Sequence, residues 1–560
     1  MSIRTEINRG SNGVFISRLQ SEEETETSST KTDKLSVLEM KPLSTSSDFG
    51  AKKITKSELM EILKSAEKND YLADLLQNKG YSLEISDISF DFNQGFKDLN
   101  LNGITFQNCN FDWPLFNNSN LDEVKFINSK LDNPCFLNSQ INQSLFTDSV
   151  IIDGVFSGAL LKETEFSRVT LINTNFEDAQ ITDGLFSKAA MPGTHFLQAE
   201  VKSTKIIQSD LTDTIFFGNE GSFSMDGPSA ASMKITRPVT TILMIPGVRG
   251  LTVPKAYEKL KKDVDSIALR INAYPAKLDT KAVTKEVEGA LKEISTDTER
   301  KKSLGEELME RANKDNKEDS IFRREILQKA EVISAHVDGI LLPGGEDIPA
   351  KLYGKSDIEG EDWEIKDMGT DYRRSLLEFS LIKKSVSKGI PLIGLCRGFQ
   401  ISNIYFGSEL TQHVDGHLMV RQDYTLLKEE DALGYFGSLD GKTFTSISAH
   451  HQAISKNNAP KSFLQPTIIF DDLIKAVEPK NPATAPLLAV QFHPELDRTY
   501  PHMMEAGTRR EAEEVLEKSG QYEVFAKKIS SDNSIIWTTY RQSVKSKRRK
   551  KQLAAAFEKK

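Results

Sequence analysis

The sequence predicts a multidomain protein in which a four-sided β-coil precedes an α/β domain with a mostly parallel central sheet. Three observations lead to this prediction: a five-residue hydrophobic period over residues 96–216, strand–helix alternation after Arg237, and a length of 560 residues, which suggests two to four domains. Hydrophobic residues make up 38% and charged residues 27% of the chain. This composition is sufficient for packed hydrophobic cores and is also compatible with additional polar segments.

Composition also excludes several classes of protein. The chain has no apolar run of about 18 residues, so a transmembrane helix is not expected. Its first residues contain no apolar h-region, which argues against a Sec-type signal peptide. The only three cysteines, Cys109, Cys135 and Cys396, are too few for a disulfide framework and indicate a reducing compartment. We therefore expect a cytoplasmic protein without a membrane span.

The N-terminal region divides into a polar head and a short helical segment. Residues 1–50 are rich in Ser, Thr and Glu and predict a disordered head, because they cannot bury enough apolar surface to offset chain entropy. From Thr55 a helical pattern begins, and Glu58 completes the spacing of a capping box. We interpret residues 51–95 as a helical cap on the segment that follows, since repeat arrays need capped ends.

The five-residue period is the strongest signal in the sequence. Steps of five from Phe96 to Phe216 give 25 consecutive apolar positions, 13 of them Phe. Chance would produce such a run with a probability of about 10⁻¹⁰, so it marks an internal repeat. At the position two residues before each of these centres, small side chains predominate. Neither a helix nor a strand has this period, which predicts one pentapeptide per side of a four-sided coil with the central and small residues inside.

These repeats resemble the pentapeptide-repeat family over about residues 96–217. The resemblance implies a right-handed quadrilateral β-helix. Over residues 96–216 the chain has 8 Lys/Arg and 15 Asp/Glu, a net charge of −7, against −9 for the whole chain. The acidic faces suggest a protein partner for the rod, and one alternative function is an interaction protein, such as a DNA mimic, that acts through them. Binding of nucleic acid itself is not expected.

The remainder of the chain divides by composition. Residues 218–236 are rich in Gly, Ser and Ala and predict a linker, so the flanking domains should be separable. Strands alternate with helices over residues 237–500, which favours a sheet covered on both faces. Within that domain, the highly charged residues 276–335 suggest a helical insertion or lid. Residues 501–560 predict a helical, increasingly basic tail.

Three motifs of the α/β domain can carry chemistry. Gly394-Leu395-Cys396-Arg397-Gly398 follows an apolar run and predicts a nucleophile elbow, in which glycines permit the sharp turn that exposes one side chain. His493 and Glu495 stand two residues apart after another strand, a spacing that lets the carboxylate orient the imidazole. Thiol, imidazole and carboxylate together form a nucleophilic triad. The third motif is the Gly344-Gly345 turn, which can direct N–H groups at an oxyanion.

Together these motifs resemble the class I glutamine amidotransferase-like superfamily, and within it the γ-glutamyl-γ-aminobutyrate hydrolase branch, over about residues 237–498. The resemblance is carried by DGILLPGGEDIPAKLYG (338–354), PLIGLCRGFQISNIYFGSELTQ (391–412), SAHHQ (448–452) and LLAVQFHPE (487–495).

The resemblance assigns roles to residues and predicts a γ-glutamyl hydrolase with a thiol nucleophile. It makes Cys396 the nucleophile, His493 the acid/base and Glu495 its orienter. Oxyanion N–H groups would come from Gly345 and Arg397. Substrate-binding residues would be Gln400, His450, His451 and Gln452, although the His-His-Gln stretch also fits a polar loop packed on the sheet. The reaction needs no cofactor and no metal.

Two departures from that branch lie where substrate entry would be shaped. Arg374-Ser375 stands where the branch has Arg-Asp, and the charged segment 276–335 is longer than expected. The substrate, a small-molecule or protein-linked γ-glutamyl compound, therefore cannot be specified further. A second alternative is a glutaminase subunit that supplies ammonia to a separate synthetase. The disordered head, rod and basic tail also resemble bacterial effectors delivered into host cells.

Overall fold

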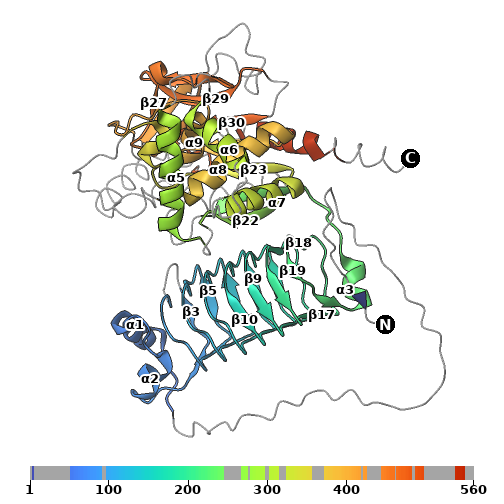
Figure 1. Cartoon of the computed structure of the whole chain (residues 1–560). Helices are drawn as coiled ribbons and strands as arrows, with labels where there is room; N and C mark the ends of the chain where they lie inside the picture. The colour runs from blue at the N-terminus through green and yellow to red at the C-terminus, as the bar shows by residue number, and fades with distance from the viewer. Residues whose placement is uncertain are drawn as a thin grey trace, which may run out of the picture. The chain divides into compact units, whose positions relative to one another are not determined.

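The computed structural model describes residues 3–4, 51–90, 96–244, 266–274, 278–296, 302–314, 323–355, 371–417, 420–425, 443–460, 462–481, 486–496, 536–548 and 551. The chain separates into two compact units, Met1–Thr236 and Arg237–Lys560 (Figure 1). Among the described residues, no helix is both long and apolar enough to cross a membrane.

Two short helices precede the strands of the first unit. They are α1 (Lys56–Ser65) and α2 (Leu72–Gln77). The predicted capping box is present, because the Thr55 side chain accepts a hydrogen bond from the N–H of Glu58 while the Glu58 carboxylate accepts one from the N–H of Thr55. Leu59 and Ile62 on α1 are buried in the same hydrophobic core as the solenoid residues. The helices thus cover one end of the repeat array.

The strands that follow form a four-sided β-solenoid with a pentapeptide repeat, as predicted. A nine-stranded sheet comprises β1 (Ile3–Arg4), β2 (Glu84–Ser86), β4 (Thr105–Gln107), β6 (Lys125–Ile127), β8 (Leu145–Thr147), β11 (Glu165–Ser167), β14 (Leu185–Ser187), β17 (Lys205–Ile207) and β20 (Ser224–Met225). The other three faces hold shorter sheets. A five-stranded sheet comprises β3 (Ser89–Phe90), β5 (Asn110–Asp112), β7 (Lys130–Asp132), β9 (Val150–Ile152) and β12 (Thr170–Ile172), and a four-stranded sheet comprises β10 (Leu160–Lys162), β13 (Gln180–Thr182), β16 (Glu200–Lys202) and β19 (Glu220–Gly221). A two-stranded sheet comprises β15 (His195–Leu197) and β18 (Ile215–Phe217).

Successive coils are about 20 residues apart, and strands of neighbouring coils pair in parallel, whereas β1 pairs antiparallel with β20. Phe126 is the register partner of Phe146, and Phe146 that of Phe166. The right-handed sense of the coil stays a prediction.

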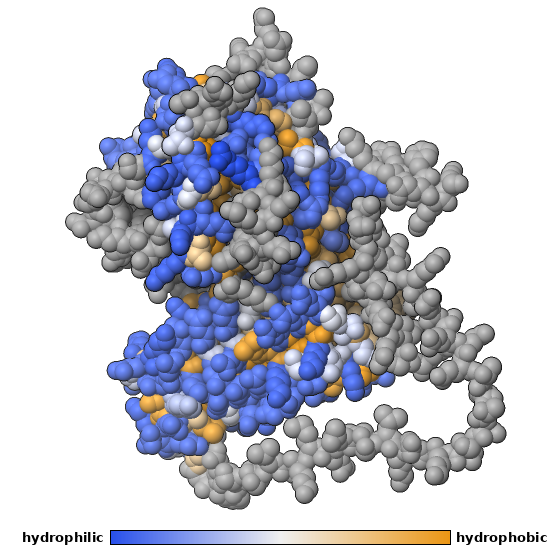
Figure 2. All heavy atoms as spheres, in the orientation of Figure 1, coloured by the Kyte–Doolittle hydropathy of each residue, from blue (hydrophilic) through white to orange (hydrophobic). Residues whose placement is uncertain are grey.

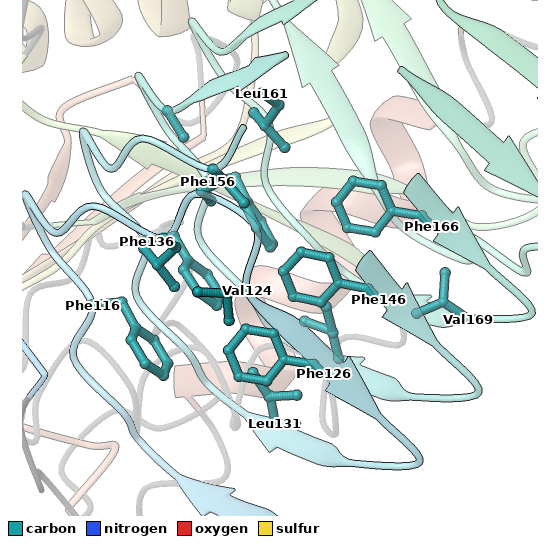
Figure 3. Close-up of a cluster of buried hydrophobic side chains, with 14 of the residues drawn as sticks. Phe116, Val124, Phe126, Leu131, Phe136, Phe146, Phe156, Leu161, Phe166 and Val169 are labelled. Atoms are coloured by element: carbon teal, nitrogen blue, oxygen red, sulfur yellow. The ribbon is translucent and has the colours of Figure 1, made fainter. Parts of the chain in front are cut away.

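Phenylalanines stack in two columns inside the solenoid (Figure 3). One column includes Phe116, Phe136 and Phe156, whose successive ring centroids are 4.8 and 4.5 Å apart. The other includes Phe126 and Phe146, at 5.0 Å. Rings of different columns meet edge to face, as the 6.1 Å contact between Phe136 and Phe146 shows. Both arrangements are favourable for aromatic pairs and add to the hydrophobic burial of the core.

The small inward residues and the corners of the coil explain the rest of the repeat. The Ser149 hydroxyl donates to the carbonyl of Phe126 at 3.1 Å, so the small position satisfies a buried polar group while it leaves room for the rings. Two residues after each centre the chain turns through a left-handed conformation, for example at Asn108, Asn118 and Asp148. Asn, Asp and Gly tolerate this conformation best, which accounts for their recurrence at the corners.

The predicted linker at 218–236 is wrong. Residues in this range form β19 and β20, which pair with β16 and β17 of the preceding coil, and α3 (Gly227–Ser232). Phe223 and Met225 are buried in the solenoid core. This polar segment therefore ends the solenoid instead of separating two domains. The coil also begins before the predicted boundary at residue 96, because β2 and β3 already pair with the next coil.

The second unit is built on an eight-stranded mixed sheet. Its strands are β21 (Val239–Met244), β22 (Ile267–Asn272), β23 (Gly339–Leu342), β24 (Leu392–Leu395), β27 (Ile454–Ser455), β28 (Leu464–Phe470), β29 (Leu473–Pro479) and β30 (Leu487–Val490). The order is β22-β21-β23-β24-β30-β29-β27, with β28 beside β29. The pairings from β22 to β30 are parallel and those of β29 antiparallel. A hairpin of β25 (Val420–Thr425) and β26 (Thr443–Ser448) forms a separate small sheet.

The described parts of the charged segment 276–335 are helical. They form α5 (Thr280–Ser295), α6 (Leu304–Lys314), a π-helical turn (Arg323–Leu327) and α7 (Gln328–His336). These helices pack on α8 (Tyr372–Lys388), which in turn contacts α9 (Arg397–Tyr405). Apolar residues such as Val287 and Met309 are buried there. The charges occupy the outer faces of amphipathic helices, so composition alone misrepresents the segment.

A C-terminal helix at residues 536–548 belongs to the core of the second unit. Its residues Trp537 and Tyr540 are buried in one cluster with Leu341 and Ile393 of the central strands. The predicted domain end at residue 500 is therefore too early, because part of the basic tail completes the core. The predicted head, except Ile3–Arg4, and residues 497–535 lie outside the described residues.

We expect Trp537→Ala to destabilise the second unit by about 3 kcal/mol, because it leaves a large cavity in the core. Trp537 is 1% exposed, and its indole N–H donates to the carbonyl of Pro494 at 3.5 Å. Differential scanning calorimetry of the full chain should show a lower transition for this unit and an unchanged one for the solenoid. An unchanged scan would mean that the helix is not part of the core.

The surface of the solenoid carries the polar side chains that its inward pattern leaves outside. Hydrophilic residues cover most of its described surface in this view, with smaller apolar areas between them (Figure 2). Hydrogen bonds between coils run along this surface, for example from Asn128 to Asn108 at 2.9 Å and from Asn108 to Asp87 at 3.0 Å. These bonds join polar side chains of neighbouring coils at intervals of 20 or 21 residues.

Candidate active site

A sharp turn between β24 and α9 presents Cys396. Its φ of 49° and ψ of −101° are unfavourable for a residue with a side chain, as expected for a nucleophile elbow. The turn requires glycine on both sides. A Cβ on Gly398 would lie 2.1 Å from the Leu342 carbonyl oxygen, and one on Gly394 would lie 2.6 Å from the Gly398 oxygen. The two glycines therefore let α9 begin close against the strands.

The Cys396 side chain is 7% exposed and stands at the N-terminus of α9. Its Sγ lies 3.8 Å from the carbonyl oxygen of Ala449, to which the thiol donates, and 3.7 Å from the side-chain amide nitrogen of Gln491. The helix N-terminus and the Gln491 amide both place positive ends of dipoles near the sulfur.

His493 and Glu495 form a buried pair beside the thiol. His493 Nδ1 lies 2.8 Å from Glu495 Oε1, and both side chains are at most 2% exposed. Burial acts to lower the pKa of His493, but the Glu495 carboxylate and the Cys396 side chain outweigh it and hold that pKa well above its usual value. The structure therefore brings together the three residues that the sequence grouped as a triad.

The turn after β23 and the start of α9 follow the carboxyl ends of two neighbouring parallel strands, β23 and β24. Gly345 has a φ of 147°, a conformation that suits glycine. Among the described residues, the N–H groups of Gly345 and Arg397 make no backbone hydrogen bond. The Arg397 side chain is committed elsewhere, since its guanidinium bonds to the Glu346 carbonyl and the Ser375 hydroxyl. Only its backbone N–H is left for a substrate.

A buried network of two arginines and two glutamates holds this turn in place. Arg374 is paired with Glu346 at 2.8 Å and with Glu378 at 2.9 Å, and Arg397 also pairs with Glu378. Arg374 donates to the carbonyls of Pro343 and Gly344 at 3.1 Å as well. Burial acts to raise the pKa of Glu346, but the two arginine charges outweigh it and lower that pKa to about 2. Such a paired network fixes the Gly-Gly turn relative to α9.

Sequence reasoning missed this network. In the sequence, Arg374 stands out only for the unusual Ser375 beside it, and Glu378 resembles any other charge on an amphipathic helix. The structure shows that Glu378 supplies the carboxylate for Arg397, while Ser375 adds only a hydroxyl. A glutamate four residues after an arginine on a helix was the available signal.

The four predicted substrate-binding residues point in different directions. The Gln400 amide donates to the backbone carbonyl of Gln452 at 3.0 Å, which joins α9 to the His-His-Gln loop. His451 is paired with Asp347 at 3.0 Å, and this carboxylate raises the pKa of His451. His450 faces inward and is 4% exposed. The loop adjoins the thiol through the carbonyl of Ala449, which contacts Cys396 Sγ.

Lys475 on β29 is a further buried group that sequence reasoning missed. It is 0% exposed, and its Nζ lies 3.0 Å from His450 Nε2 and 3.3 Å from His417 Nδ1. The two imidazole rings stack with centroids 5.1 Å apart. In the sequence, Lys475 resembles an outward polar residue of an alternating strand, so nothing local indicated its burial.

Comparison with known proteins agrees with this architecture. A family model described as Peptidase C26 matches residues 322–495, and one described as Pentapeptide repeat region matches residues 119–196. The fold and the motif order define a class I glutamine amidotransferase-like domain joined to a β-solenoid. The chain thus contains a Peptidase C26 domain and a pentapeptide-repeat region, which confirms the resemblances to the class I glutamine amidotransferase-like superfamily and to the pentapeptide-repeat family.

Curated relatives match parts of the chain. A "Putative glutamine amidotransferase" of Schizosaccharomyces pombe is 32% identical over 173 residues, which cover 29% of this chain and 64% of that protein. A "Putative glutamine amidotransferase-like protein" of Lactococcus lactis is 31% identical over 171 residues, 28% of this chain and 66% of that protein. The chain therefore spans slightly less than two thirds of each relative.

Among solved structures, a glutamine amidotransferase from Thermotoga maritima aligns with a TM-score of 0.30 and 10% identity, over 56% of this chain and 99% of that one. QnrB1, described as a plasmid-mediated fluoroquinolone resistance protein, aligns with a TM-score of 0.19 and 17% identity, over 26% of this chain and 86% of that one.

Proposed function

We propose that the protein hydrolyses γ-glutamyl amide bonds through a thioester on Cys396. The observation that carries this proposal is the strained thiol of Cys396 beside a buried His493–Glu495 pair at 2.8 Å. The match to the Peptidase C26 model, together with relatives named putative glutamine amidotransferases, supports an enzyme of the glutamine amidotransferase type. The γ-glutamyl substrate is suggested by the resemblance of the four motifs to the γ-glutamyl-γ-aminobutyrate hydrolase branch.

The proposed reaction has two halves. The Cys396 thiolate attacks the γ-carbonyl carbon, and the resulting oxyanion accepts hydrogen bonds from the N–H groups of Gly345 and Arg397. The C–N bond then breaks, the amine takes a proton from His493, and a thioester remains. In the second half His493 removes a proton from water, which attacks the thioester and releases a free γ-carboxyl group and the thiol.

The high pKa of His493 suits the first half of this reaction. An imidazolium held by Glu495 is ready to protonate the departing amine, and the same charge stabilises the neighbouring thiolate. The buried network around Arg374 serves to keep the Gly345 N–H at a fixed position, since an oxyanion donor acts best when it is preorganised.

A panel of γ-glutamyl compounds tests the proposal. The full chain is incubated with γ-glutamyl derivatives of small amines, with γ-glutamylated peptides and with free glutamine, and the released amine or ammonia is measured. Hydrolysis of amine derivatives in preference to glutamine supports the proposed activity. Release of ammonia from glutamine alone would instead support a glutaminase subunit for a separate synthetase. No release from any compound would contradict both.

We expect Glu495→Gln to lower kcat by about 10²-fold, less than the loss of the nucleophile, because Glu495 orients and charges His493 without reacting itself. Loss of the carboxylate should also lower the pKa of His493, since that carboxylate raises it. On its alkaline side, the pH–rate profile of this variant should therefore begin to fall at a lower pH than that of wild type. Steady-state kinetics over a pH series provides the measurement.

The matched control is Glu409→Gln, which removes an exposed carboxylate paired with Lys355 at 3.1 Å. This variant should retain the wild-type profile. Equal rates for Glu495→Gln and wild type at every pH would show that Glu495 has no part in the reaction.

For the solenoid we propose a recognition or scaffold role, supported by its polar, net acidic repeat surface. An interaction with a protein partner is the corresponding expectation. We also propose a reducing, cytoplasmic setting, supported by a sequence that contains only three cysteines, too few for a disulfide framework.

A further inference from the structure

A buried cationic cluster adjoins the thiol and has no part in the triad. It consists of Lys475, His450 and His417, which come from β29, the loop after β26 and the loop before β25. The Lys475 ammonium donates to an imidazole nitrogen of each histidine. His450 must therefore carry its ring proton on Nδ1, because Nε2 accepts from lysine. The side-chain amide of Gln422 also donates to His417 Nδ1, at 2.8 Å.

Lys475 has no carboxylate partner among the described residues. No Asp or Glu oxygen of the described part of the chain lies within the 4.0 Å of an ion pair to its Nζ. A buried ammonium without a counterion is costly, and proteins seldom keep one unless an anion can use it. Its neighbours on both sides are neutral imidazoles, since burial and then the Lys475 charge lower the pKa of His450 and of His417.

The anion available to this cluster is the Cys396 thiolate. The strand that carries Lys475 is joined to the site, because the N–H of Gln491 donates to the Lys475 carbonyl at 2.8 Å and the Gln491 side chain reaches Cys396 Sγ at 3.7 Å. On the other side, His450 directly follows Ala449, whose carbonyl contacts the same sulfur. Burial lowers the pKa of Lys475, and the charge of Cys396 acts in the opposite direction.

We infer that Lys475, on β29, is a positioning residue: its charge stabilises the thiolate of Cys396, and its hydrogen bond fixes the tautomer of His450. This inference rests on the proposed thiol chemistry but adds a charge that the triad does not contain. The groups that act on Lys475 are Cys396, His417, His450 and, from the turn between β28 and β29, Asp471.

The inference makes the reactivity of the thiol depend on pH in a particular way. Burial lowers the pKa of Lys475 to about 7, and the charges of Asp471 and Cys396 act in the opposite direction. The lysine is therefore charged and stabilises the thiolate in mildly acidic solution, and it becomes neutral in alkaline solution. Its contribution should be largest below neutral pH and should fade above it.

The test is the rate of iodoacetamide alkylation of Cys396 in the full chain as a function of pH, followed by peptide mass spectrometry. Lys475→Met should react about tenfold more slowly than wild type at about pH 6, because the thiolate, which is the form that reacts, loses the attraction of the lysine charge. The two rates should converge in alkaline solution. The control, Lys456→Met, removes an exposed lysine paired with Asp472 and should follow wild type.

Circular dichroism identifies a methionine variant that fails to fold. In that case Lys475→Gln replaces it, because the amide keeps an N–H donor for His450 without the charge, and the same slower alkylation is expected. A folded variant of either kind with the wild-type alkylation profile would overturn the inference. Alkylation needs no substrate, so this outcome is distinct from failure of the proposed hydrolysis, in which Cys396 reacts normally but no γ-glutamyl compound is cleaved.

Discussion

Cys396→Ala is expected to reduce γ-glutamyl amide hydrolysis by about 10⁴-fold or more, the largest effect of any single substitution in this chain. Without a thiol no thioester forms, and the remaining donors can assist only direct attack by water. The side chain is small and 7% exposed, so its loss should cost little stability. Release of amine from the most active γ-glutamyl compound, measured for wild type and variant, determines the effect.

Cys135→Ala is the matched control. Cys135 lies in the solenoid, so its removal should leave turnover unchanged. Turnover by Cys396→Ala within about tenfold of wild type would rule out a covalent mechanism on this residue.

Phe156→Asp is expected to destabilise the solenoid by more than about 5 kcal/mol. The side chain is 0% exposed and stacks between Phe136 at 4.5 Å and Phe176 at 4.8 Å. Aspartate removes these contacts and leaves a buried charge without a partner in the column. Urea unfolding of the full chain, followed by circular dichroism, should show an early transition for the solenoid.

Leu160→Asp tests the same coil at an outward position. Leu160 is 39% exposed, so this variant should change stability by no more than about 0.5 kcal/mol. Phe156→Asp with the unfolding midpoint of wild type would show that the phenylalanine columns do not hold the solenoid together.

The solenoid was predictable because its period is a property of consecutive residues. A centre every five residues requires no knowledge of distant contacts, and the stacked columns follow from it. The end of the array was not predictable in the same way. Gly221 stands where the next centre is due, and the burial of Phe223 and Met225 arises from closure of the last coil. Composition therefore suggested a linker where the chain forms a cap.

The same distinction applies to the active site. Cys396, His493 and Glu495 lie in short motifs at strand ends, and parallel strands bring such ends to one edge of a sheet. Their supporting residues come from distant segments and carry no local mark. Lys475 occupies a strand whose pattern suggests that one face is exposed, and Glu378 lies on a helix with other charges. Trp537 lies within residues 501–560, whose basic composition suggested a tail separate from the domain.

The thioester itself provides the most direct test of the proposed mechanism. Wild-type protein is mixed with a γ-glutamyl anilide, quenched in acid within the first turnovers and digested for mass spectrometry. The peptide that contains Cys396 should gain the mass of one γ-glutamyl group, and Glu495→Gln should also yield this adduct. Amine release without any adduct on Cys396, or an adduct on a different residue, would contradict nucleophilic catalysis by this thiol.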